Sequence, residues 1–255
     1  MCIRDRNWRE GLWAFLSQKT LFKTRPIVGF VHAIVAWGFT LYLFVNIFDV
    51  LYGFIPGFKF FPNHFLGHIY RLFIDIFSIL VLFGILYFLS RRFLQKDKKL
   101  KIESPVLLSE LAKDRIKSDS LLVGFFIFIH VGSRFLSASF EIAHSKSDIY
   151  QPAANAVAKL WVNMPHENIL LFEHIFWWFA LGLILTFLPY FPYSKHAHLF
   201  MGPINIMAKE NRKSMSALEK IDFEDEDLEQ FGSSRLHHLP QTQILDGYAC
   251  IQCNR

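Results

Sequence analysis

The chain has 255 residues, of which 53% are hydrophobic and 17% are aromatic, and its formal net charge is +5. Ordinary soluble domains are about 45–50% apolar, so the excess is modest on average, but it is gathered into blocks. Four long apolar helices with little amphipathic helix to cover them argue against a soluble protein. The composition therefore favours a membrane protein, and we expect lipid rather than nucleic acid as its surroundings.

Four stretches of the chain are long enough to cross a membrane, because about 20 apolar residues span a hydrocarbon core of roughly 30 Å. They lie at residues 26–50, 65–93, 121–143 and 169–191. The sequence therefore predicts an all-α fold. We expect a polytopic bundle of four transmembrane helices, followed by a truncated cytoplasmic tail of the ferredoxin type.

The uneven distribution of lysine and arginine predicts the orientation of this bundle. The segment between the second and third spans carries nine of the 27 in the chain: Arg91, Arg92, Lys96, Lys98, Lys99, Lys101, Lys113, Arg115 and Lys117. The segment between the first and second spans carries only Lys59. Because these residues mark cytoplasmic loops, we expect a multi-pass protein of the cytoplasmic (inner) membrane with its tail in the cytoplasm.

Four regions follow one another along the chain. Residues 1–25 are a basic cytoplasmic approach to the membrane, and residues 1–6 match a translated sequencing-adapter remnant, so we expect this start to be artefactual. Residues 26–192 form a transmembrane domain of the haem-b type. Residues 193–240 are a cytoplasmic hinge and an acidic linker, whose acids lie within 222–229. Residues 241–255 begin an incomplete [4Fe–4S] domain of the ferredoxin type.

Histidines inside the predicted spans are the first candidates for chemistry. Ionisable side chains at membrane depth are costly and mark functional sites by default. His32, His130 and His174 lie in three different spans, and His196 and His198 follow the last one. Neutral imidazole is an axial ligand of haem iron, and helical bundles build such sites between facing helices. The alternative for each histidine is a hydrogen bond to a neighbouring helix.

The depth of each histidine suggests how they pair. Counted from the predicted span ends, His130 and His174 lie within roughly 5 Å of each other in depth. His32 is expected to pair with His196 or His198, and a His32–His130 pair is the competing arrangement. Arg71 and Arg134 are expected to bind haem propionates. No C-x-x-C-H motif is present, so the predicted cofactor is one or two non-covalent b-type haems.

Cys250 and Cys253 are the candidate metal ligands of the tail. Their C-x-x-C spacing matches the start of the C-x-x-C-x-x-C motif of iron–sulfur proteins. Cytoplasmic compartments disfavour disulfides, so redox or metal chemistry is the favoured interpretation there. Zinc sites and thioredoxin-like motifs share this spacing. We expect a complete [4Fe–4S] cluster only in a longer chain.

The order of several stretches resembles that of heterodisulfide-reductase-like iron–sulfur proteins, over nearly the whole chain after residue 7. These stretches are Arg25-Pro26 leading to His32, Trp177-Trp178, Lys195-His196-Ala197-His198-Leu199-Phe200 with Pro203 and Asn205, Asp222-Phe223-Glu224-Asp225, and Asp246-Gly247-Tyr248-Ala249-Cys250. The membrane domain of that family is similar to the gamma subunit of respiratory nitrate reductase, a b-type cytochrome. Some relatives carry a histidine where this chain has Ala180, with His174 as the natural substitute, and relatives usually have one further N-terminal span.

The resemblance implies a membrane haem domain that feeds a domain with two [4Fe–4S] clusters. It also implies a quinone, such as menaquinone, and a soluble redox partner, such as an electron-transfer flavoprotein. The predicted function is therefore that of a membrane anchor and electron-transfer subunit of a quinone-linked oxidoreductase, acting through b-type haem. The alternative is a non-redox polytopic membrane protein, either a transporter or an assembly factor. Transporters tend to show inverted repeats and broken helices, and neither is visible in the sequence.

Overall fold

The computed structural model describes residues 7–58, 64–100, 109–145, 147–208, 224, 235–239 and 241–249. The described residues form helices and no strands. The long helices are α3 (Pro26–Phe54), α4 (Phe65–Leu89), α5 (Glu110–Ser145) and α7 (His166–Tyr190). The shorter ones are α1 (Asn7–Ser17), α2 (Lys19–Thr24), α6 (Pro152–Ala158), α8 (His198–Ala208) and α9 (Gln241–Ala249). A π-helical turn, Ser90–Leu94, extends α4, and 3₁₀ turns lie at Lys98–Leu100, Phe191–Tyr193, Lys195–Ala197 and Leu236–His238.

Among the described residues, four helices are long and apolar enough to cross a membrane: Pro26–Phe54, Phe65–Leu94, Glu110–Ser145 and His166–Tyr193. The predicted all-α fold with four such helices is confirmed. The third of them begins at Glu110 rather than at residue 121. Its first turns are polar, so they were not part of the apolar stretch predicted from the sequence. Large apolar side chains such as Phe83 and Leu188 are exposed on the outside of the bundle, as expected for helices that face lipid.

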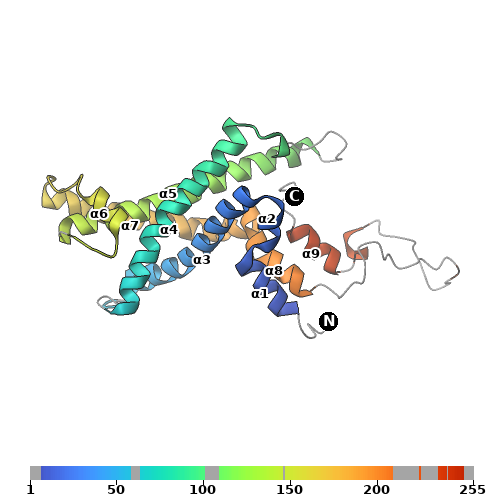
Figure 1. The fold of residues 1–255 in the computed structure, drawn as a ribbon, viewed down its shortest axis with the longest axis horizontal. Coiled ribbons are helices and arrows are strands. Elements are labelled where there is room, and N and C mark those ends of the chain that lie inside the picture. The colour runs from blue at the N-terminus through green and yellow to red at the C-terminus, as the bar shows by residue number, and fades with distance from the viewer. Residues whose placement is uncertain are drawn as a thin grey trace.

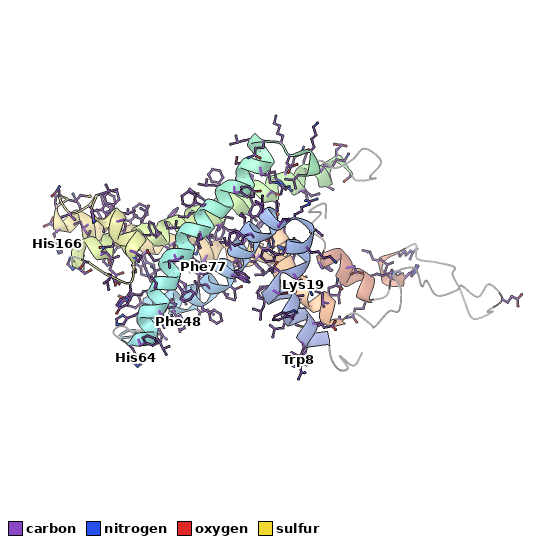
Figure 2. The ribbon with its side chains drawn as sticks, in the orientation of Figure 1. Trp8, Lys19, Phe48, His64, Phe77 and His166 are labelled. Atoms are coloured by element: carbon purple, nitrogen blue, oxygen red, sulfur yellow. The ribbon has the colours of Figure 1, made fainter. Side chains whose placement is uncertain are left out.

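The long helices cross one another with α5 in the middle, packed against α4, α6 and α7. One end of the bundle, the α6 end, holds α6, the end of α3 and the start of α4 (Figure 1). The opposite end, the α8 end, holds α1, α2, α8 and α9. Figure 2 shows His64 and His166 at the α6 end, and Trp8 and Lys19 at the α8 end.

Small residues allow the close approach of α3 and α4. A Cβ atom at Gly38 would lie 2.3 Å from Cγ2 of Val81, and one at Gly84 would lie 2.7 Å from Cγ2 of Val35. Both distances are shorter than the contacts that Cβ atoms make with neighbouring atoms in proteins. The two glycines therefore serve helix packing, which is the common role of small residues between membrane helices.

The segment predicted to be a hinge contains a helix. Residues 198–208 form α8 although Pro203 lies inside it, and proline removes one backbone hydrogen bond from a helix interior. Packing compensates for this loss, because α8 lies between α1 and α9. Tertiary contacts here outweigh local propensity, as they often do.

Candidate functional site

His130 lies on α5 with the geometry of a metal-binding imidazole. Its side chain is buried, and its Nδ1 is 3.0 Å from the backbone oxygen of Ala180 on α7. Nδ1–H therefore donates to that carbonyl, and Nε2 is buried without a hydrogen-bond partner among the described residues. Histidines that bind metals usually donate their other ring N–H to a carbonyl or carboxylate in this way.

An apolar cavity of about 480 Å³ lies beside His130. It is bounded by α3, α5 and α7, with Phe200 of α8 at one side, and its lining is almost entirely hydrocarbon. His130 is the one histidine in this lining. A cavity with this lining suits an apolar, flat or chain-like group better than ordered water.

Three histidines gather at the α8 end. The ring centroids of His32 and His198 are 6.3 Å apart, and Nδ1 of His198 bonds to the backbone oxygen of Lys195. Two imidazoles that bind one metal ion from opposite sides at about 2 Å each place their centroids about 6 Å apart. His32 and His198 therefore have the separation of a pair of axial ligands.

His196 is the third member and is the most deeply enclosed by aromatic rings. Its ring lies 5.1 Å from that of Phe39 and 5.8 Å from that of Phe187. Burial, and then the nearby His198, Lys195 and His32, lower the pKa of His196 to about 3. Burial and Arg92 also lower the pKa of Lys195 to about 8, while Asp119 opposes that shift. The imidazole of His196 is therefore neutral near pH 7.

Aromatic stacking connects His130 to the histidines of the α8 end. The rings of His130 and Phe126 are parallel at 5.8 Å, and Phe126 stacks on Phe187 at 4.0 Å. Phe187 in turn contacts the ring of His196 edge-on. The histidines that sequence analysis singled out on α5 and after α7 therefore belong to one continuous aromatic core.

A second cavity, of about 970 Å³, lies toward the α6 end and has a polar lining. Its lining includes an ion pair between Arg134 of α5 and Asp49 of α3, with Nε–Oδ2 and Nη2–Oδ1 distances of 2.7 and 3.3 Å. Tyr42 lines both cavities, and its hydroxyl shares a 2.7 Å hydrogen bond with Ser78. The ring of Tyr42 also lies 5.9 Å from that of His130, so Tyr42 separates the two cavities.

His174 lies in the polar cavity, away from His130. Its ring nitrogen Nδ1 bonds to the backbone oxygen of Leu170, and its side chain is exposed. The neighbouring Glu173 accepts a hydrogen bond from Ser137, whereas His130 faces Ala180. Ser137 is seven residues beyond His130, a rise of about 10 Å. The expected shared depth of His130 and His174 is therefore wrong, because it was counted from assumed span ends rather than from the helix contacts.

Both candidate arginines bind carboxylates of the protein itself. Arg134 is paired with Asp49, and Arg71 lies 3.3 Å from a carboxylate oxygen of Asp148 and 2.8 Å from Nδ1 of His68. Arg71 is at the α6 end, in the lining of the polar cavity. The arginines therefore form part of the protein's own ion-pair network at this end.

Sequence analysis missed Asp49 and Asp119, and both have structural partners. Asp49 could have been found from the sequence, because it is an acidic residue inside the first apolar stretch. Such a residue needs a cationic partner at the same depth. Asp119 accepts from the hydroxyl of Tyr190 at 2.7 Å and from the backbone N–H of Lys195 at 3.2 Å. It therefore ties the segment that carries His196 to α5. Cys250, Cys253 and the acidic residues 222–229, except Glu224, lie outside the described residues.

The donor sets suit haem better than a bare metal ion. Among the described ranges, no group of three or more His, Cys, Asp or Glu side chains is close enough to hold an ion by itself. A porphyrin brings its own nitrogens and takes its axial ligands from the protein. An imidazole with a buried Nε2 beside an apolar cavity, and two imidazoles at ligand separation, fit this requirement.

The chain is similar to two curated oxidoreductases. It is 30% identical to "Probable iron-sulfur-binding oxidoreductase FadF" of Bacillus subtilis, over 98% of this chain and 34% of the relative. It is 23% identical to "EtfAB:quinone oxidoreductase" of Syntrophomonas wolfei, over 99% of this chain and 34% of that protein. The chain thus spans about a third of the length of these relatives, which support an iron–sulfur oxidoreductase-like protein.

No family model matches the chain, and no solved structure matches it.

Proposed function

We propose that the chain is the membrane part of a quinone-linked oxidoreductase, which moves electrons between a quinone and iron–sulfur clusters through b-type haem. The observation that carries this proposal is the environment of His130. Its Nδ1 is held by the Ala180 carbonyl, and its buried Nε2 lies beside a hydrocarbon-lined cavity. Haem bound here would supply a one-electron centre.

The ligand residues we propose are His130 on α5 and the pair His32 and His198 at the α8 end. His130 is held in one tautomer by Ala180, as a metal ligand requires. His32 and His198 have ring centroids 6.3 Å apart. His196 lies between these sites as a half-buried neutral ring and is the reserve ligand at the α8 end. His174 is exposed in the polar cavity, so it is not in the proposed set.

The quinone headgroup is assigned to the polar cavity. A quinone takes up two electrons and two protons to become a quinol, so its site needs hydrogen-bond donors and an exit to water. Tyr42, Ser78 and Arg134 offer donors in this lining, and Asp49, Glu141 and Glu173 offer acceptors. Tyr42 contacts His130 directly. Electrons therefore have a short route between this cavity and the proposed haem ligand.

The other electron carriers are proposed at the α8 end. Cys250 and Cys253 follow α9 in the sequence, and their spacing is that of cluster ligands. One relative is named an EtfAB:quinone oxidoreductase, which supports an electron-transfer flavoprotein as the soluble partner. We propose that the α8 end faces the cytoplasm, because most of the lysine and arginine of the connecting segments lies there.

A dithionite-reduced minus oxidised visible spectrum of the purified protein tests the proposal. We expect the bands of a b-type cytochrome and extraction of non-covalent haem by acidic acetone. His130→Ala and His198→Ala should each lose at least half of the haem per chain. His174→Ala is the matched control and should retain it.

Absence of haem from the wild-type protein, after expression with ample haem supply, would contradict the redox function and favour a non-redox membrane protein. Loss of haem in His174→Ala with full haem in His130→Ala would show that the ligand assignment is wrong.

A further inference from the structure

Two histidines meet at the α6 end, away from the proposed haem ligands. His144 belongs to the last turn of α5, and His166 is the first residue of α7. Their Nδ1 atoms are 3.3 Å apart, and their ring centroids are 4.5 Å apart with an angle of 41° between the ring planes. Both side chains are exposed, and Figure 2 shows His166 at this end of the molecule. Dissolved ions can therefore reach the pair.

The geometry of this pair is that of two imidazoles bound to one metal ion at adjacent coordination positions. Bonds between zinc and imidazole nitrogen are about 2.0–2.1 Å long. When two such bonds meet at about 90–110°, the nitrogens lie about 2.9–3.4 Å apart and the ring centroids about 4.5–5.2 Å apart. Both distances between His144 and His166 fall within these ranges. The alternative is a hydrogen bond in which one Nδ1–H donates to the other Nδ1.

The charges around the pair favour a cation. Glu141 lies three residues before His144 and therefore on the same face of α5. Glu141 and His144 are both close enough to Glu173 of α7 to interact with it electrostatically. Two carboxylates near a pair of imidazoles attract a divalent ion. Both carboxylates also line the polar cavity, so the histidine pair lies beside the acidic part of that lining.

We propose that His144 and His166 form a two-histidine clamp that binds a divalent transition-metal ion, such as Zn²⁺ or Cu²⁺, from the water at the α6 end. Imidazole is a suitable ligand for these ions. Water fills the other coordination positions, because no third His, Cys, Asp or Glu completes a metal-binding group within the part of the chain that the structure describes. The bound ion joins the end of α5 to the start of α7 and so closes the connection that carries α6. The clamp does not rest on the proposed function, since neither histidine is a proposed haem ligand.

Binding of Cu²⁺–iminodiacetate to the full chain in detergent, followed by electron paramagnetic resonance, tests the clamp. The chelator leaves positions on the copper that two neighbouring imidazoles fill together, and the cysteines are alkylated first so that thiols do not compete. His144→Ala and His166→Ala should each weaken the tightest binding about tenfold or more, because the second imidazole otherwise binds as an intramolecular ligand. His64→Ala removes another exposed histidine of the α6 end (Figure 2). It is the matched control and should bind copper as the wild type does.

Thermal unfolding provides a second measurement. Zn²⁺ should raise the unfolding temperature of the wild type by about 2 °C or more, because an ion that binds only the folded chain stabilises it. The shift should be less than half as large in either alanine variant, and both variants should fold, since the substituted side chains are exposed.

Three outcomes would overturn the clamp. Unchanged copper binding in both alanine variants, or an unchanged Zn²⁺ shift in both, would leave the pair as a hydrogen bond. An equal loss of copper binding in His64→Ala would show that the ion binds elsewhere. Because neither haem nor electron transfer is measured, these outcomes are separate from a failure of the proposed function.

Discussion

The two cavities share helices α3, α5 and α7 but have opposite chemistry, and α4 adds polar side chains such as Asp75 and Ser78 to the polar one. On α5, Phe126 and His130 face the apolar cavity, and Arg134 and Glu141 face the polar one only one to three turns further along. Tyr42 stands between them with its hydroxyl on Ser78 and its ring toward His130. The bundle therefore places charged side chains around one cavity and keeps them out of the lining of the other, and Tyr42 lies at the boundary.

The largest effect is expected from breaking the ion pair of the polar cavity. Arg134→Leu leaves the carboxylate of Asp49 without its cation in a largely buried site. Removing one partner of a buried pair typically costs about 3–5 kcal/mol. Unfolding of the protein in mixed detergent, followed by circular dichroism, measures the loss.

The double variant Arg134→Leu with Asp49→Leu is the control for that experiment. Replacing both partners leaves no uncompensated charge, so it should recover most of the stability. If both variants were equally unstable, the polar cavity would not depend on charge pairing.

An intermediate effect is expected from protonating His196 at the α8 end. Burial lowers the pKa of His196 from its ordinary 6.5 to about 3, so the unfolded chain binds the proton more readily than the folded one. Stability is therefore fully present above pH 6.5 and is lost as the pH falls toward 3, by up to about 1.4 kcal/mol per pH unit. His196→Phe should remove this part of the pH dependence. Unfolding midpoints of the two proteins at several pH values provide the measurement, and parallel curves would count against a buried neutral ring.

The smallest effect is expected at the boundary between the cavities. Tyr42→Phe and Ser78→Ala each remove the 2.7 Å hydrogen bond between these side chains, and a bond of this kind contributes about 1 kcal/mol. Ser78 also donates to the backbone oxygen of Ile74, so the double-mutant cycle is needed to isolate the pair. A coupling energy near zero would show that the tyrosine separates the cavities by its ring alone.

Sequence reasoning succeeded where length and hydrophobicity decide the outcome. The four spans were predicted because an apolar run of about 20 residues has few alternatives to a membrane helix. Helix α8 was interpreted as a hinge, since its Pro203 and polar residues obscure a helix that exists through its contacts with α1 and α9. No sequence signal reports such contacts.

The histidine assignments also succeeded in one part and failed in another. His32 and His198 were predicted as one possible pair from their expected depth, and the structure brings their rings to 6.3 Å. The depth estimate failed for His130 and His174, because α5 has 36 residues and crosses its neighbours obliquely. Asp49 was overlooked although Arg134 had been noted. Predicting an ion pair between two helices requires the rotation of each helix about its axis as well as the depth of each residue.

The carboxylate of Asp75 has a consequence for the order in which the protein assembles. This side chain on α4 accepts hydrogen bonds from the backbone N–H groups of Ala153 and Ala154, at 2.7 and 2.9 Å, across 78 and 79 residues. Chains emerge from the ribosome N-terminus first, so α4 is synthesised well before either donor. The contact between α6 and α4 can therefore form only after residues 152–158 have been made, and it fastens α4 to a later part of the chain.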